Sequence, residues 1–241
     1  MTEHVTIPIF SSGWWLGFWI NALVILIIIW YARTLDKTKE PIFRKILAWI
    51  YLGREILHQI VMITAGTWSL DVSLPLQLCG ISSMISIYLL FKPRQTPFEF
   101  LALLGLAGAI HSFLTPELTH GGTVYHYIEY YVSHGGIVMT ALYMHLVLGM
   151  RPNVRSWLNV FLWGNGVLLI VGTINYLFSA NYIYLCTPPM ADNPLIFGPW
   201  PYYIIGFEVA GLIHIFLLYK LFRRSFRLAP VKKENLPGIN D

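Results

Sequence analysis

Long runs of apolar residues alternate with short polar segments along the chain. A helix that crosses a bilayer needs about 20 predominantly apolar residues, because each residue adds only about 1.5 Å to its length. Runs of roughly this length cover residues 13–31, 43–66, 74–91, 98–114, 127–150, 157–178 and 200–222. The pattern predicts an all-α, polytopic membrane protein in which seven transmembrane helices form one bundle.

The composition supports this class. Hydrophobic residues make up 56% of the chain and charged residues 12%, about half the charged share of a typical soluble domain. We expect one transmembrane domain over residues 1–228 and a polar cytoplasmic tail over residues 229–241. The net charge of +4 indicates contact with anionic lipid head groups. The expected partner is therefore the lipid bilayer and not nucleic acid.

Lysine and arginine occupy alternate loops, which predicts the orientation. The segments 67–73, 115–126 and 179–199 contain neither residue. The intervening loops and the C-terminal segment are basic and include Lys37, Lys39, Lys92, Arg94, Arg151, Arg155, Arg223 and Arg224. Because basic loops stay in the cytoplasm, we expect the N-terminus outside and the C-terminus inside, in a cell membrane such as the bacterial plasma membrane.

Polar and ionisable residues within the predicted helices gather in the outer half of the bilayer. Such residues are costly in hydrocarbon, so they usually face the bundle interior and mark function. They come from several helices and comprise Arg54, Glu55, His58, His111, His126, Glu129, His134, Asn175, Tyr176 and Glu208. This convergence predicts a polar cavity that opens toward the outer leaflet. The alternative is a set of hydrogen bonds that only holds the helices together.

A lone cysteine stands near the start of the third predicted helix, in the stretch DVSLPLQLCGISS. Pro75 suits an early helix position, so Cys79 is expected near the positive end of the helix dipole, which favours a thiolate. Burial among leucines opposes it. His134, at a similar depth in the fifth helix, is the best candidate for a base. Glu129 or Glu208 is then the third group of a nucleophilic site.

Two simpler interpretations of the cysteine remain open from the residues alone. A cysteine in an apolar helix is often only a small core residue. Cys186, in an outer loop, offers a disulfide partner in an oxidising compartment. Such a bridge would remove the nucleophile.

Four motifs are similar to those of a known family. They are PLQLC at the third helix, YHYIEYYVSHGG at the fifth, NYLF at the end of the sixth and GPWPYY before the seventh. In this order, the chain resembles the YwaF-like family of bacterial integral membrane proteins, whose eukaryotic relative is a membrane acyltransferase of ether-phospholipid remodelling. The resemblance implies acyl transfer through a cysteine and a histidine, which fall on Cys79 and His134. Relatives often carry a histidine where this chain has Gln77.

The resulting hypothesis is a two-step acyl exchange between phospholipids and lysophospholipids. His134 takes the proton of Cys79, and the thiolate attacks a lipid ester to form an acyl thioester. Arg54, Asn175 or backbone N–H groups at the helix start stabilise the oxyanion. The remaining candidates are supporting residues, Glu55 and His58, and substrate-binding residues, Gln77, His111, His126 and Tyr176. Water in place of the acceptor would make the same site a lipase, and neither reaction needs a metal or another cofactor.

Two other classes compete with this hypothesis. Glu55 and His58 form the E-x-x-H unit of di-metal bundles, but only one copy is present, so we expect no metal. A transporter or proton-conducting protein using Glu208, His214 and Glu55 is the alternative function. A retinal protein is excluded because the last helix has a lysine, Lys220, only at its cytoplasmic end.

Overall fold

The computed structural model describes residues 5–119, 121–189 and 198–224, and the predicted tail 229–241 lies outside them. The described chain is helical apart from a short antiparallel pair, β1 (Val5–Thr6) with β2 (Glu117–Leu118). Its helices are α1 (Ser12–Thr34), α2 (Lys39–Thr64), α3 (Leu78–Phe91), α4 (Gln95–Phe100), α5 (Leu106–Leu114), α6 (Val124–Leu146), α7 (Ser156–Phe178) and α8 (Tyr202–Arg223). A π-helical turn, η1 (Leu101–Gly105), joins α4 to α5 in one rod, and a 3₁₀ turn, η2 (Tyr182–Tyr184), follows α7.

Five of the described helical rods are long and apolar enough to cross a membrane. They are α1, α2, the rod Gln95–Leu114, α7 and α8. The shorter apolar helix α3 has 14 residues, and α6, which carries Glu129 and three histidines, is not among the five. The predicted all-α membrane class is confirmed in this coarser form.

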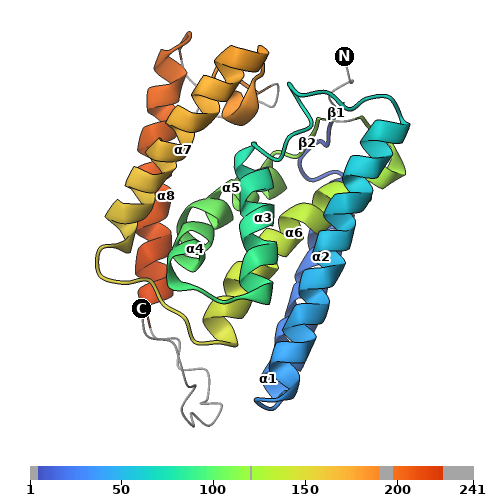
Figure 1. Cartoon of the computed structure of the whole chain (residues 1–241), viewed down its shortest axis with the longest axis vertical. Helices are drawn as coiled ribbons and strands as arrows, with labels where there is room; N and C mark the ends of the chain where they lie inside the picture. Colours follow the sequence, from blue (N-terminus) through green and yellow to red (C-terminus); the bar gives the residue numbers. More distant parts are fainter. Residues whose placement is uncertain (1–4, 120, 190–197, 225–241) are drawn as a thin grey trace.

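The rod Gln95–Leu114 lies at the centre of the bundle. In its most apolar stretch, 56% of the residues are buried, against 11% in α7. Figure 1 shows α1 and α2 on one side and α7 and α8 on the other, with the remaining helices between them. Large apolar side chains on the outer helices point away from the protein, for example Trp30 and Leu169. Such faces are suited to lipid and would be unusual on a soluble protein.

The predicted start of the third helix at Pro75 is wrong. The helix begins at Leu78, and Gln77 before it has an extended backbone with φ −62° and ψ 150°. A β-carbon on Gly80 would lie 2.8 Å from the carbonyl carbon of Pro75. The proline segment therefore folds back beneath the first turn of α3 instead of forming it, and Cys79 becomes the second residue of the helix.

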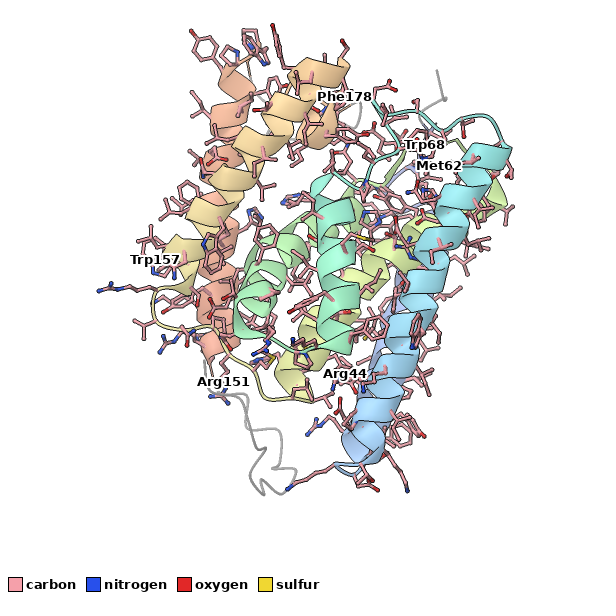
Figure 2. The ribbon with its side chains drawn as sticks, viewed as in Figure 1. Arg44, Met62, Trp68, Arg151, Trp157 and Phe178 are labelled. Atoms are coloured by element: carbon pink, nitrogen blue, oxygen red, sulfur yellow. The ribbon has the colours of Figure 1, made fainter. Side chains whose placement is uncertain are left out.

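The two ends of the bundle differ in charge. One end, the basic end, carries the loops at residues 35–38, 92–94 and 147–155. The opposite, cation-free end is formed by the described loop residues 65–77, 115–119, 121–123, 179–189 and 198–201. In Figure 2, Arg44 and Arg151 lie toward the basic end, and Met62, Trp68 and Phe178 toward the cation-free end. Among the described lysines and arginines, only Arg54 lies away from the basic end, within α2.

Candidate functional site

A cavity of about 450 Å³ lies among the helices next to the cation-free end. Its walls come from α2, α3, α5, α6, α7 and α8 and from the loops above them. Much of the lining is apolar, including Leu104, Phe161 and Phe207. The sequence-predicted residues that line it are Arg54, Glu55, His58, Gln77, Cys79, His111, His126, Glu129, His134, Glu208 and His214.

Asn175 and Tyr176 do not line this cavity. The side chain of Asn175 is buried and forms two hydrogen bonds with the backbone of Tyr182, each 2.9 Å long. It therefore fixes the turn after α7 and is committed to that contact. Tyr176 is 87% exposed and points away from the bundle.

Cys79 lies against α5 at a point where that helix has no side chain. A β-carbon on Gly108 would lie 3.0 Å from the Cδ2 atom of Leu78 and 3.7 Å from the Sγ atom of Cys79. The Sγ atom lies 3.5 Å from the Oγ atom of Ser112. Because the hydroxyl of Ser112 donates to the carbonyl of Gly108 at 3.1 Å, its oxygen accepts a hydrogen bond from the thiol S–H. The small residue on α5 thus lets the thiol approach and find a partner.

Both described cysteines are free thiols. Cys186 is exposed, and its backbone N–H is held by Asn181 at 2.9 Å. The structure therefore contains no disulfide between Cys79 and Cys186, and the Cys79 sulfur remains a free thiol.

The imidazole of His134 has a fixed proton position. Its Nδ1 atom lies 2.7 Å from the carbonyl oxygen of Tyr130, and because a carbonyl only accepts, Nδ1 is the donor. In the neutral ring, Nε2 then keeps a free lone pair. The ring of Tyr130 lies 4.2 Å from that of His134, and its hydroxyl donates to the backbone carbonyl of Ser112 at 2.8 Å.

Cys79 and His134 share no hydrogen bond, and only intermediate residues connect them. The contacts run from the thiol to Ser112, from Ser112 to Tyr130, and from Tyr130 to His134. Sequence reasoning missed Ser112 and Tyr130. Tyr130 lies one helical turn before His134, so helical spacing would have placed it on the same face.

Arg54 links three helices in the wall of the cavity. Its guanidinium donates to Glu129 of α6, to Glu55 at 2.6 Å and to Ser83 of α3 at 2.8 Å. The two carboxylates hold the only described lysine or arginine in this part of the bundle, and both terminal nitrogens of Arg54 are occupied. A buried charge with this many partners fixes the geometry of the surrounding helices.

Polar pairs also connect the opposite wall of the cavity. Asn165 of α7 donates to Glu208 of α8 at 3.0 Å. His111 of α5 and His214 of α8 lie with their Nε2 atoms 3.1 Å apart. These contacts tie α8 to α7 and to the central rod.

The cation-free end is closed in part by two segments that are bonded to each other. Gln77 accepts a hydrogen bond from the backbone of Ile183 at 2.7 Å. The hydroxyl of Tyr182 accepts from the backbone of Leu74 and donates to that of Leu70. Gln77 thus lines the cavity while it holds η2 over the start of α3.

The side chains considered as metal ligands in the sequence contact other groups. Among the described residues, no three His, Cys, Asp or Glu side chains come together closely enough to hold an ion. His58 of the E-x-x-H unit faces Tyr125, with its Nδ1 atom 3.4 Å from the phenolic oxygen. His126 is held at its Nδ1 atom by Thr123 at 2.8 Å.

Comparison with known proteins gives one match. The TMEM164 family model matches residues 9–219, which include α1 to α7, most of α8 and every described residue that lines the cavity. No curated protein and no solved structure matches the chain.

Proposed function

The chain belongs to the TMEM164 family of multi-pass membrane proteins, and on this premise we propose that it is an intramembrane lipid acyltransferase with Cys79 as its nucleophile. The observation that carries the proposal is a free thiol in the first turn of α3, at the wall of a largely apolar cavity. Its substrates are phospholipids and lysophospholipids of the surrounding bilayer. Their acyl chains remain in apolar surroundings while the ester reaches the thiol.

Backbone N–H groups in the first turn of α3 can stabilise the negative charge that develops on the sulfur and on the ester oxygen. A helix leaves its first backbone N–H groups without partners inside the helix, and Gln77 makes no side-chain cap for them. The N–H groups near Cys79 can therefore stabilise a thiolate once a base has formed it, and they can donate to the oxyanion of a tetrahedral intermediate. Arg54 is less suited to this role, because Glu55 and Glu129 occupy its terminal nitrogens.

In the first half-reaction, His134 acts as the base. Its Nε2 atom takes the thiol proton, and the sulfur attacks the ester carbonyl of the donor lipid. The C–O bond breaks, the leaving lysolipid takes the proton from His134, and the acyl chain remains on Cys79 as a thioester. In the second half-reaction, a lysolipid hydroxyl takes the acyl chain and Cys79 returns to the thiol. Glu129 and Glu208 support the site, the first through Arg54 and the second through Asn165.

The charge distribution supports the proposed placement in the membrane. With the basic end in the cytoplasm, the cavity lies in the outer half of the bilayer. We propose seven spans, in which the shorter α3 and the more polar α6 complete the five long apolar rods. We also propose that the protein resides in a bacterial plasma membrane and that it is related to the membrane acyltransferase of ether-phospholipid remodelling.

The direct test is the intact mass of purified, unreduced protein after incubation with a phospholipid. A fatty-acyl mass that hydroxylamine removes, present in the wild type and in Cys186→Ser but absent in Cys79→Ser, is the expected result. No adduct with any donor would overturn the proposal. If the adduct forms, release of the acyl chain to added lysophospholipid indicates transfer, whereas release as free fatty acid without an acceptor indicates hydrolysis.

A further inference from the structure

The 3₁₀ turn η2 has an unfavourable backbone conformation. Ile183 has φ 57° and ψ 21°, and Tyr184 follows it with φ 53°. Residues with a side chain rarely adopt this left-handed conformation, and a β-branched residue such as isoleucine is a clear outlier there. A strained turn persists only when the surrounding structure holds it, and such turns cluster at ligand clamps and switch regions.

Side chains from other elements hold the turn in this conformation. Its own backbone hydrogen bonds are long, at 3.3 and 3.4 Å. By contrast, the N–H of Ile183 donates to the side chain of Gln77 at 2.7 Å, and the hydroxyl of Tyr203 in α8 donates to the carbonyl of Tyr184 at 2.7 Å. Gln77 directly precedes α3 and lies two positions before Cys79. The strained turn is therefore tied to the helix that carries the thiol.

The turn also lies close to the thiol in space. Ile183, Tyr184 and Leu185 line the same cavity as Cys79. Burial raises the pKa of the Tyr184 hydroxyl, and the nearby negative charges of Glu117 and of a Cys79 thiolate raise it further. This part of the chain thus separates the thiol from the cation-free end of the bundle.

We propose that residues 182–185 form a strained lid over Cys79, which opens to admit a lipid and is held closed by Gln77 and Tyr203. When the lid opens, the hydrogen bonds to these two side chains break and the two left-handed residues return to a favoured backbone conformation. The release of strain offsets part of the cost of the broken bonds, so the open state lies close in free energy to the closed one. The inference does not depend on the proposed acyl transfer, because access to a free thiol can be measured directly.

The test is the rate at which Cys79 reacts with pyrene maleimide, a bulky thiol reagent, in purified protein in detergent. Cys186→Ser removes the only other cysteine, and intact mass follows the reaction. In this background, Ile183→Ala and Ile183→Gly both truncate the side chain, but only glycine adopts the left-handed conformation without strain. Ile183→Gly is expected to react at least about two- to fivefold more slowly than Ile183→Ala, which corresponds to the roughly 0.4–1 kcal/mol that alanine loses relative to glycine at such a backbone angle.

A second pair of variants tests the bond from α8. Tyr203→Phe removes one oxygen and with it the hydrogen bond to Tyr184. Cys79 is then expected to react about fivefold faster, the factor for one hydrogen bond of about 1 kcal/mol. Tyr202→Phe is the matched control, because this neighbouring side chain is 61% exposed, and it is expected to react at the wild-type rate. Because only one oxygen is removed, this pair keeps the test decisive if the variants at Ile183 do not fold.

A third pair tests the bond from the start of α3. Gln77→Met removes the acceptor for the N–H of Ile183 and is expected to increase the reaction rate by a similar factor. Gln59→Met is the control at another glutamine of the cavity wall, whose hydrogen bonds go to Ser73 and Trp68. It is expected to leave the rate unchanged.

The outcomes distinguish the lid from the proposed function. Equal rates in Ile183→Gly and Ile183→Ala would show that opening releases no backbone strain and would overturn the inference. Wild-type rates in Tyr203→Phe and Gln77→Met would overturn it too, as would a folded wild type in which Cys79 never reacts. If labelling changes as expected but no phospholipid gives an acyl adduct, the lid stands and the proposed acyl transfer falls.

Discussion

The Sγ atom of Cys79 and the Oγ atom of Ser112 lie 3.5 Å apart across the contact between α3 and α5. Since the Ser112 hydroxyl already donates to Gly108, its oxygen accepts the hydrogen bond from the thiol S–H. The resting thiol is therefore oriented but protonated. The acylation that we propose needs a base, and this requirement connects the serine contact to the imidazoles in the same cavity.

Ser112→Ala is expected to slow thioester formation about five- to tenfold. One neutral hydrogen bond contributes about 1 kcal/mol, and without it the thiol loses its preferred direction. The measurement is the initial rate of hydroxylamine-labile adduct formation. Ser86→Ala is the control, because Ser86 donates to the backbone of its own helix and does not line the cavity. A wild-type rate in Ser112→Ala would mean that this contact has no part in acylation.

Gly108→Val is expected to reduce acylation more than tenfold. Even a single β-carbon there would press on Leu78 and approach the sulfur of Cys79, so the first turn of α3 must shift. Gly166→Val is the matched control on α7, because a β-carbon at Gly166 meets nothing within 4 Å. The adduct rate is compared at equal thermal stability in detergent. If both variants acylate alike, close packing at Gly108 does not position the thiol.

Arg54→Met is expected to destabilise the fold by about 3–5 kcal/mol, because it leaves the buried carboxylates Glu55 and Glu129 without their cation. Adding Glu129→Gln to Arg54→Met is expected to restore part of that loss. Thermal unfolding of the purified protein in detergent measures both changes. Arg151→Gln, at the exposed basic end, is expected to change the unfolding temperature little. Wild-type stability in Arg54→Met would show that the ion cluster does not hold the three helices.

Asn175→Ala is expected to cost about 2 kcal/mol or more of stability, since two backbone groups of Tyr182 lose their partner in a buried place. Tyr176→Ala, one residue further on, is expected to be nearly neutral because that side chain is exposed. Unfolding temperatures of the two variants provide the comparison. A neutral Asn175→Ala with impaired turnover would instead favour the catalytic role that the sequence suggested for it.

The positions of the long apolar helices could be predicted from the sequence with small errors. The runs 157–178 and 200–222 correspond to Ser156–Phe178 and Tyr202–Arg223. Length and hydropathy alone determine these elements. The start of α3 could not be predicted in the same way, because both a first-turn proline and a proline folded beneath the helix satisfy the local rules. The sequence also contains no pattern that predicts the π-helical turn Leu101–Gly105 or the pairing of β1 with β2.

The sequence predicted along which helices the candidate residues lie, but it could not predict the direction in which each side chain points. Position along a helix places Asn175 and Tyr176 near the cation-free end, yet one is bonded to the turn at Tyr182 and the other points away from the bundle. Residue type also did not identify the contacts of Cys79 and His134, since a serine and a tyrosine such as Ser112 and Tyr130 are common in membrane helices. Their importance comes from contacts between α3, α5 and α6, which only the assembled bundle reveals.

The ion cluster at Arg54 has a consequence for how the protein enters its membrane. A guanidinium within a membrane-spanning helix is costly while it is unpaired. Because Glu55 is the next residue of the same helix and binds Arg54 directly, α2 carries its own counter-charge as it inserts. Glu129 lies 74 residues beyond Glu55 in the sequence, so its bond forms only after α6 has been made. The Arg54–Glu55 pair thus lowers the cost of inserting α2, and the later bond to Glu129 stabilises the packing of α2 against α6.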